Sequence, residues 1–235
     1  MFKDKKLSIL GDSISTYTNV SNGDGAKFNK TILNNHVYYH PGRFDIYLND
    51  TWWMQVINKL GFKLLVNNSW SGSCIYQFRS ETDGAYKTRC TELHNDNTFE
   101  EPDYILVFLG TNDFGVFPDL VGTSNINYDL LTEPTTICEA YAVMLSKIKN
   151  RYKNAKVYCM GLLAREYRYS EVIDFNNDLK AISNHYNYEY IDLFDTEIKD
   201  NLNRYCDYIA DGNVHPSKLG MNIIANRVIE KLLSK

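Results

Sequence analysis

Five short apolar runs recur along the chain at wide intervals. They cover residues 7–10, 63–66, 104–109, 156–160 and 188–193. Apolar side chains within them do not alternate with polar ones, a pattern typical of strands that are buried on both faces of a parallel sheet. We therefore expect about five parallel strands.

Between these runs the apolar spacing changes to every third or fourth residue, which predicts amphipathic helices. Thr136 and Glu139 have the spacing of a capping box, and the helix they open is expected to end within residues 150–154. Its apolar face comprises Ile137, Tyr141, Met144, Leu145, Ile148 and Tyr152. Two further helices are predicted around residues 172–182 and 221–232. Trp52 and Trp53 are expected to start another core-facing helix, with one indole reaching the cleft.

Strands that alternate with amphipathic helices predict right-handed crossovers and a three-layer α/β/α sandwich with a flavodoxin-like sheet. The sequence has no internal repeat or linker, so one domain over residues 1–235 is the expected organisation. Two insertions, residues 19–49 and 114–134, are long and irregular. Each closely follows a predicted strand, so both are expected to border a cleft at the carboxyl edge of the sheet.

Composition narrows the class of protein. The 235 residues are 44% hydrophobic with a formal net charge of −4, and no apolar stretch is long enough to span a membrane. The basic residues are scattered, so neither nucleic acid nor a membrane is an expected partner. The charged start, residues 1–6, is not a secretory leader, which predicts a cytoplasmic location, although a leader removed beforehand would leave the same sequence. The five cysteines lack C-x-x-C spacing and are expected to be free, mainly buried thiols.

Chemistry-bearing residues follow the predicted strands. Gly11-Asp12-Ser13-Ile14 comes after the first run, Asn67-Asn68-Ser69-Trp70-Ser71-Gly72-Ser73 after the second and Gly110-Thr111-Asn112-Asp113 after the third. His215-Pro216 precedes the final helix. Each motif alone also fits a simple turn or helix cap, and the proline could mark only a helix entry.

Taken in order, Ser13, Gly72, Asn112 and His215 resemble the four sequence blocks of the SGNH (GDSL-type) hydrolase superfamily, over nearly the whole chain. The resemblance implies that Ser13 is a nucleophile and His215 its general base. It also implies an oxyanion hole made by the backbone N–H groups of Ser13 and Gly72 and the side-chain amide of Asn112. A serine hydroxyl needs such a base, and the oxyanion of the tetrahedral intermediate needs preorganised donors.

One position departs from the family pattern. The family places an aspartate three residues before the histidine, where this chain has Gly212, and Asp211 lies four residues before His215. Asp211 is the favoured third member of a triad, because Gly212 can absorb the extra residue and a carboxylate stabilises imidazolium well. The alternative is a Ser-His dyad in which a main-chain carbonyl, such as that of Gly212, accepts the imidazole N–H.

The resemblance predicts a serine esterase. Abundant tyrosine and an aromatic stretch at residues 37–44 favour a carbohydrate substrate that carries a short acyl group, with acetyl preferred. The alternatives are a lipase, lysophospholipase or thioesterase, an acyltransferase on the same fold, and a non-catalytic carbohydrate-binding relative. The proposed substrate contacts are Arg43, Tyr76 and Arg79.

No cofactor or metal is expected. The chain has no G-x-G-x-x-G after its first run and no P-loop. Two histidine pairings have helical ligand spacing, His36 with His40 and Cys90 with His94, but neither has the glutamate of a metalloprotease helix.

Overall fold

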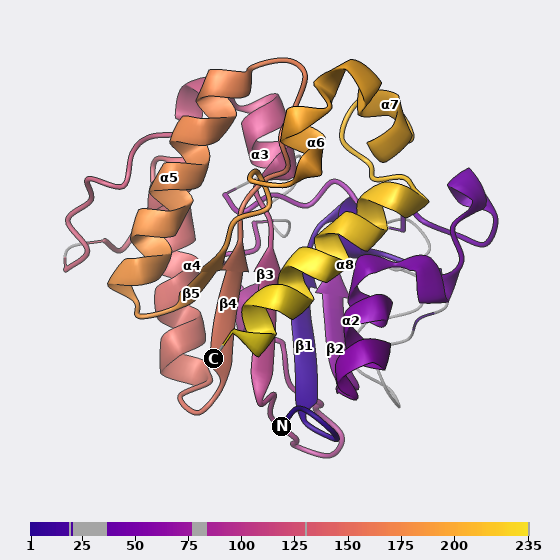
Figure 1. The fold of residues 1–235 in the computed structure, drawn as a ribbon. Helices are drawn as coiled ribbons and strands as arrows, with labels where there is room; N and C mark the ends of the chain where they lie inside the picture. The colour runs from indigo at the N-terminus through magenta and orange to yellow at the C-terminus, as the bar shows by residue number, and fades with distance from the viewer. Residues whose placement is uncertain (19, 21–36, 77–83, 130, 235) are drawn as a thin grey trace.

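The computed structural model describes residues 1–18, 20, 37–76, 84–129 and 131–234 (Figure 1). The strands are β1 (Lys6–Gly11), β2 (Lys63–Ser69), β3 (Tyr104–Phe108), β4 (Lys156–Met160) and β5 (Glu189–Ile191). The helices are α2 (Trp52–Leu60), α3 (Thr111–Val116), α4 (Ile137–Arg151), α5 (Tyr169–His185), α6 (Glu197–Asp200), α7 (Tyr205–Tyr208) and α8 (Lys218–Leu233).

The five strands form one sheet in the order β2-β1-β3-β4-β5, and every neighbouring pair is parallel. All five residues of β3, at the centre, are buried, as its unbroken apolar sequence predicts. The predicted α/β class and the flavodoxin-like sheet are therefore confirmed. Strand order reverses between β1 and β3, and a crevice for ligands is expected at the carboxyl ends of those strands.

Helices cover the sheet on both sides. α2 and α8 lie side by side in front of β1 and β2 in Figure 1, while α4 and α5 pack against each other in the other layer. The predicted capping box opens α4: the Thr136 hydroxyl accepts from the Glu139 N–H at 3.2 Å and the Glu139 carboxylate accepts from the Thr136 N–H at 3.1 Å. Both termini lie near the amino edge of the sheet.

The two tryptophans begin α2, and the expectation that one reaches the cleft is wrong. Trp52 and Trp53 are both 0% exposed. The Trp52 indole N–H donates to Ser15 Oγ at 3.2 Å. Trp52 therefore supports the turn that carries Ser13 from within the core.

Three other boundaries differ from the predictions. β2 continues through the polar residues 67–69, because they pair with β1 and their side chains bond to one another and to the neighbouring turns. The start of the 114–134 insertion is helical, since α3 extends to Val116. Pro216 lies outside α8, whose N-cap is Ser217, so the proline is not a helix entry.

All five cysteines are free, and four of them are buried, as predicted; Cys206 is exposed. Within the described ranges, no helix is long and apolar enough to cross a membrane.

Candidate active site

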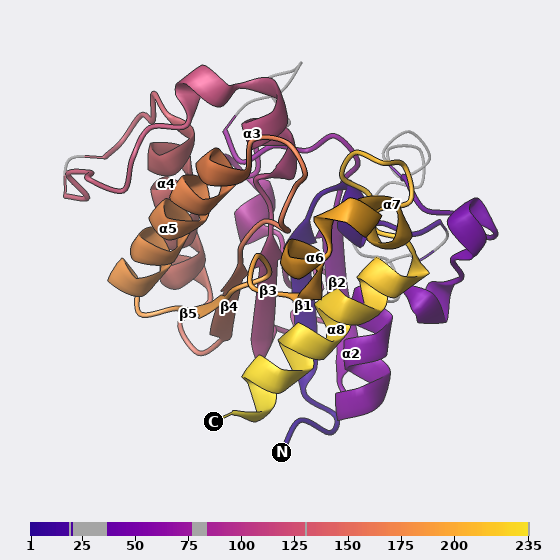
Figure 2. The same ribbon diagram turned by 45° about the horizontal axis from the view of Figure 1, so that its top comes forward.

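Ser13 lies in a tight turn directly after β1. A 3-10 helix covers Ser13–Ser15, and Asp12 caps it by accepting from the Ile14 N–H at 3.0 Å. Figure 2 turns the carboxyl edge of the sheet forward and shows α3, α6 and α7 gathered around it. Gly72 follows β2 and Asn112 lies in the first turn of α3, so residues distant in sequence meet at this edge.

The loop between α7 and α8 brings His215 onto the serine. His215 Nε2 lies 2.9 Å from Ser13 Oγ, and His215 Nδ1 lies 2.5 Å from Asp211 Oδ2. With the Nδ1 proton donated to the carboxylate, Nε2 is the ring nitrogen that accepts from the serine hydroxyl. The three side chains form the hydrogen-bonded chain expected of a serine nucleophile, its base and an orienting acid.

Asp211 reaches the imidazole despite the extra residue in the loop. Its Oδ1 atom accepts from three successive backbone N–H groups, those of Asn213, Val214 and His215, each at 3.0 Å. Gly212 has a φ of 68°, a left-handed conformation that glycine adopts without strain. The structure thus supplies the carboxylate contact, and the Gly212 carbonyl is not needed to orient the ring.

Of the predicted oxyanion-hole residues, Gly72 follows β2 and Asn112 lies in the first turn of α3, at the same edge of the sheet as Ser13. Gly72 has a φ of 78°, and the Asn112 side-chain amide donates to the Ser73 carbonyl at 2.8 Å, which fixes its orientation and leaves its second N–H for a ligand. In the part of the chain that the structure describes, no acceptor bonds to the backbone N–H of Ser13 or Gly72. These groups are available to a developing oxyanion.

Two buried charged residues that the sequence analysis missed hold this region together. Arg89, 1% exposed, donates to the carbonyls of Gly11 at 2.9 Å and Asn68 at 2.7 Å, and also bonds to Ser73 Oγ. Asp113, fully buried, accepts from the backbone N–H groups of residues 75 and 76 at 2.8 and 3.0 Å. Arg89 therefore ties β1 to β2, and Asp113 ties α3 to the segment after Gly72.

Two further buried ionisable residues, Asp12 and Arg165, lie at the serine turn. Burial raises the pKa of the Asp12 carboxyl to about 7 and that of Asp113 to about 6. Arg165, 3% exposed, donates to the Thr111 carbonyl at 3.2 Å, and burial lowers its pKa. Its positive charge partly offsets the cost of ionising Asp12.

The pKa values of His215 and Asp211 are both lower than usual. Burial lowers the pKa of His215 below its ordinary value, although Asp211 acts in the opposite sense. Burial would raise the pKa of Asp211, but the hydrogen bonds from His215 and the loop N–H groups outweigh it and lower that pKa. Near neutral pH the pair is therefore a neutral imidazole beside a carboxylate, the state a general base requires.

The three predicted substrate contacts have different outcomes. Arg43 stacks over the ring of Tyr38, which itself covers His215, so it lies at the site. Tyr76 is half-buried beyond Gly72 and stacks on Tyr86 with ring centroids 6.2 Å apart. Arg79 lies outside the described residues.

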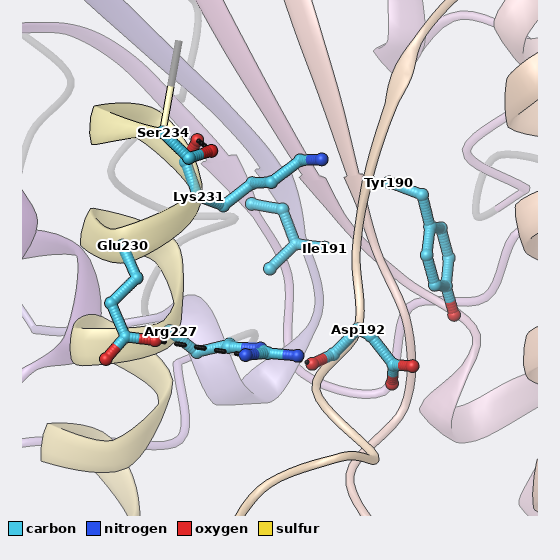
Figure 3. A pocket seen from close by; sticks show the side chains of 7 residues that line it. All are labelled: Tyr190, Ile191, Asp192, Arg227, Glu230, Lys231 and Ser234. Carbon is cyan, nitrogen blue, oxygen red and sulfur yellow. Dashed lines mark hydrogen bonds and ion pairs between the residues drawn. The ribbon is translucent and has the colours of Figure 1, made fainter.

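Another pocket, between β5 and α8, does not resemble a catalytic site (Figure 3). Its basic side chains already have partners: Arg227 donates to the main-chain carbonyl of Asp192 at 3.0 Å and lies 3.8 Å from Glu230, and Lys231 lies 3.1 Å from Glu189. None of the four motif residues is among the described residues that line it. The described ranges also hold no group of three side chains suited to a metal ion.

The fold is an α/β sheet protein with a Ser-His-Asp hydrogen-bonded chain at the carboxyl edge of its sheet. The model of the GDSL-like lipase/acylhydrolase family matches residues 5–232, nearly the whole chain. The protein belongs to this family, whose members are ester hydrolases.

Solved structures agree with this assignment. A protein from Bacteroides ovatus assigned as a GDSL-like lipase has 26% identity and a TM-score of 0.71, with 99% of this chain and 100% of that chain covered. One from Bacteroides uniformis has 28% identity and a TM-score of 0.68, with 99% and 97% covered. A carbohydrate esterase family 3 protein from Talaromyces cellulolyticus shares the fold at 17% identity and a TM-score of 0.59, with 98% and 97% covered. No curated protein matches the sequence.

Proposed function

We propose that this protein is a serine esterase that removes short acyl groups, with acetyl preferred, from a carbohydrate ester. The observation that carries the proposal is the hydrogen-bonded chain from Ser13 Oγ through His215 to Asp211, at 2.9 and 2.5 Å. We assign the oxyanion hole to three donors at the same edge of the sheet: the N–H groups of Ser13 and Gly72 and the Asn112 amide.

The reaction has two steps. Ser13 Oγ attacks the ester carbonyl carbon while His215 Nε2 takes the hydroxyl proton, and the oxyanion forms among the three donors. His215 returns that proton to the departing alcohol, which leaves an acyl group on Ser13. A water molecule, deprotonated by His215, then attacks the acyl carbon and releases the acid and free Ser13.

The shape and chemistry around the serine support a short acyl group on a sugar. Ser13 is only 2% exposed, so a slender acyl group fits better than a bulky one. Aromatic side chains surround the base: Tyr38 stacks on it, Phe44 is 37% exposed, and Tyr167 bonds to Asn213 in the same loop. Aromatic faces with nearby hydroxyl groups suit a sugar ring better than an acyl chain.

Hydrolysis of p-nitrophenyl acetate, butyrate and octanoate tests this function. We expect the wild type to prefer acetate, and Ser13→Ala and His215→Ala to abolish turnover. The matched controls Ser234→Ala and His185→Ala replace the same residue types at the C-terminal ends of α8 and α5, at the opposite edge of the sheet from the site, and should retain full activity. Intact-mass measurement of rapidly quenched enzyme should show one added acetyl group in the wild type and none in Ser13→Ala.

Three outcomes would count against the proposal. Turnover that survives Ser13→Ala would exclude this nucleophile. Rates that rise from acetate to octanoate would favour a lipase-type substrate. An acetyl-enzyme that transfers its acyl group to an added sugar faster than to water would indicate an acyltransferase, whose first step uses the same residues.

A further inference from the structure

An aromatic side chain from a distant segment lies flat against the proposed catalytic base. The ring of Tyr38 stacks on the imidazole of His215, with centroids 3.4 Å apart and an interplanar angle of 8°. On the outer face of the same ring, the Arg43 guanidinium carbon lies 3.7 Å from the centroid. Guanidinium, phenol and imidazole therefore form a three-layer stack over the site.

Tyr38 is fixed to both halves of the site. Its hydroxyl donates to Asp211 Oδ2 at 3.3 Å, the oxygen that also bonds to His215. Its backbone N–H donates to Thr16 Oγ1 at 2.9 Å, and Thr16 Oγ1 donates in turn to the Ser13 carbonyl at 2.8 Å. The tyrosine thus connects the turn of the nucleophile to the loop of the base.

We infer that Tyr38 is a positioning residue that holds the His215 ring in the orientation facing Ser13 and Asp211, with Arg43 holding Tyr38 in place. The inference rests on the proposed esterase function. A flat stack resists rotation of the imidazole out of its plane, and a displacement of about 1 Å in such a site can lower the rate roughly 100-fold. The Arg43 side chain also donates to the Tyr38 carbonyl at 3.0 Å, which fixes the outer layer.

The stack also acts on the charge that His215 acquires during the reaction. The face of an aromatic ring attracts a cation, so Tyr38 favours the imidazolium that forms when Ser13 loses its proton. Arg43 opposes that charge through the Tyr38 ring, and Asp211 favours it from the imidazole edge at Nδ1. Two further groups face the imidazole within the described ranges. Ser13 Oγ lies at Nε2, and the Tyr39 ring lies edge-on, with its centroid 6.3 Å from that of the imidazole.

Variants at position 38 separate positioning from simple packing. Tyr38→Leu removes the ring, and we expect kcat on p-nitrophenyl acetate to fall about 10- to 100-fold with KM within about twofold. Tyr38→Phe retains the ring and should remain within about threefold of the wild type. Tyr47→Leu, the same substitution at a 52%-exposed tyrosine of the same segment, is the matched control and should retain wild-type kcat.

Variants at position 43 test the charge. Arg43→Met removes the cation and retains much of the apolar stem, so the pKa of His215 should rise because the Arg43 charge that lowers it is gone. The acidic limb of the kcat/KM profile should move to higher pH. Arg43→Lys retains the charge, and its acidic limb should stay close to that of the wild type. An NMR titration of the His215 imidazole in a Ser13→Ala background gives the same comparison without relying on turnover.

Wild-type kcat in Tyr38→Leu would overturn the inference while leaving the esterase function intact. Equal losses in Tyr38→Phe and Tyr38→Leu would overturn it too, because the hydroxyl rather than the stacked ring would then be essential. A wild type that hydrolyses none of the esters would instead overturn the proposed function, and the NMR titration would still test the effect of Arg43 on His215.

Discussion

The turn that carries Ser13 and the loop that carries His215 meet in one site, but different interactions support them. The turn adjoins buried charges: Arg89 spans β1 and β2, and Asp113 holds the segment after Gly72. The loop lies at the surface and is held by three N–H bonds to Asp211, by bonds from the Tyr167 and Tyr205 hydroxyls to Asn213, and by the covering ring of Tyr38.

This difference predicts how substitutions in the serine turn and in the histidine loop affect the protein. Loss of a buried charged partner leaves polar groups unsatisfied inside the protein, which costs stability. Loss of a surface contact lets water replace it, so the fold survives but the geometry loosens. We therefore expect substitutions around the serine turn to lower stability most, and substitutions in the histidine loop to lower rate more than stability.

The largest effect is expected from Arg89→Leu. The Gly11 and Asn68 carbonyls would lose a buried donor, and because each unsatisfied carbonyl costs roughly 1–3 kcal/mol, the free energy of unfolding should fall by about 2–6 kcal/mol. Urea unfolding monitored by circular dichroism measures this. Arg151→Leu, which removes an exposed arginine paired with Glu101, is the control and should cost less than about 1 kcal/mol. Similar losses in both variants would contradict a special role for the buried arginine.

The second-largest effect is expected in the pH dependence of stability, through the carboxyl group of Asp12. Its pKa in the folded protein is raised to about 7, so the native state binds more protons than the unfolded state between about pH 4 and 7. Its contribution to stability must therefore decline as pH rises through that window, by roughly 3 kcal/mol. Asp12→Asn stays neutral and should remove this decline, as measured by urea unfolding from pH 4 to 8. The control Asp119→Asn, at an exposed aspartate, should leave the decline unchanged. Parallel curves for wild type and Asp12→Asn would refute the raised pKa.

A smaller loss of stability, with a loss of rate, is expected for Asp113→Ala. Two N–H groups after Gly72 lose their acceptor, which should cost about 2 kcal/mol and lower kcat by displacing an oxyanion donor. Thermal unfolding and ester kinetics test both effects. Asp178→Ala is matched, since Asp178 also accepts from a backbone N–H, that of Ser124 at 2.7 Å, and it should leave kcat unchanged.

The smallest change in stability is expected in the histidine loop, from Gly212→Ala. An alanine at a φ of 68° costs about 1 kcal/mol, and the strained loop should displace Asp211 and lower kcat about tenfold. Gly61→Ala, at a φ of 78° after α2, should cost similar stability without loss of rate. Equal kcat in the two variants would show that the loop tolerates displacement of its carboxylate.

Much of the fold could be predicted because its signals are local. The unbroken apolar run of β3 and the Thr136–Glu139 capping box each depend on a few neighbouring residues. Boundaries failed where distant partners decide them. β2 extends over polar residues because β1 pairs with them. Neither tryptophan reaches the cleft, because both pack in the core, where the Trp52 ring contacts Phe108 and its indole N–H bonds to Ser15.

The placement of the site residues was predictable to a similar degree. Three of the four blocks follow strands, and parallel strands bring their carboxyl ends to one edge, so Ser13, Gly72 and Asn112 had to lie near one another. Asp113 gave a weak signal beside Asn112. Arg89 gave none, because nothing in its local sequence distinguishes a buried guanidinium from an exposed one.

The sequence by itself determined the layered α/β fold and the order of the four blocks, since periodicity and strand-end motifs are properties of short segments. Only the tertiary structure decided that Asp211 reaches His215 across one extra residue, that Arg89 and Asp113 are buried supports, and that Tyr38 covers the base. These contacts join segments whose separation in space depends on the packing of the whole chain. A hydrogen bond or stacked ring is sensitive to displacements of less than an ångström, which no local pattern specifies.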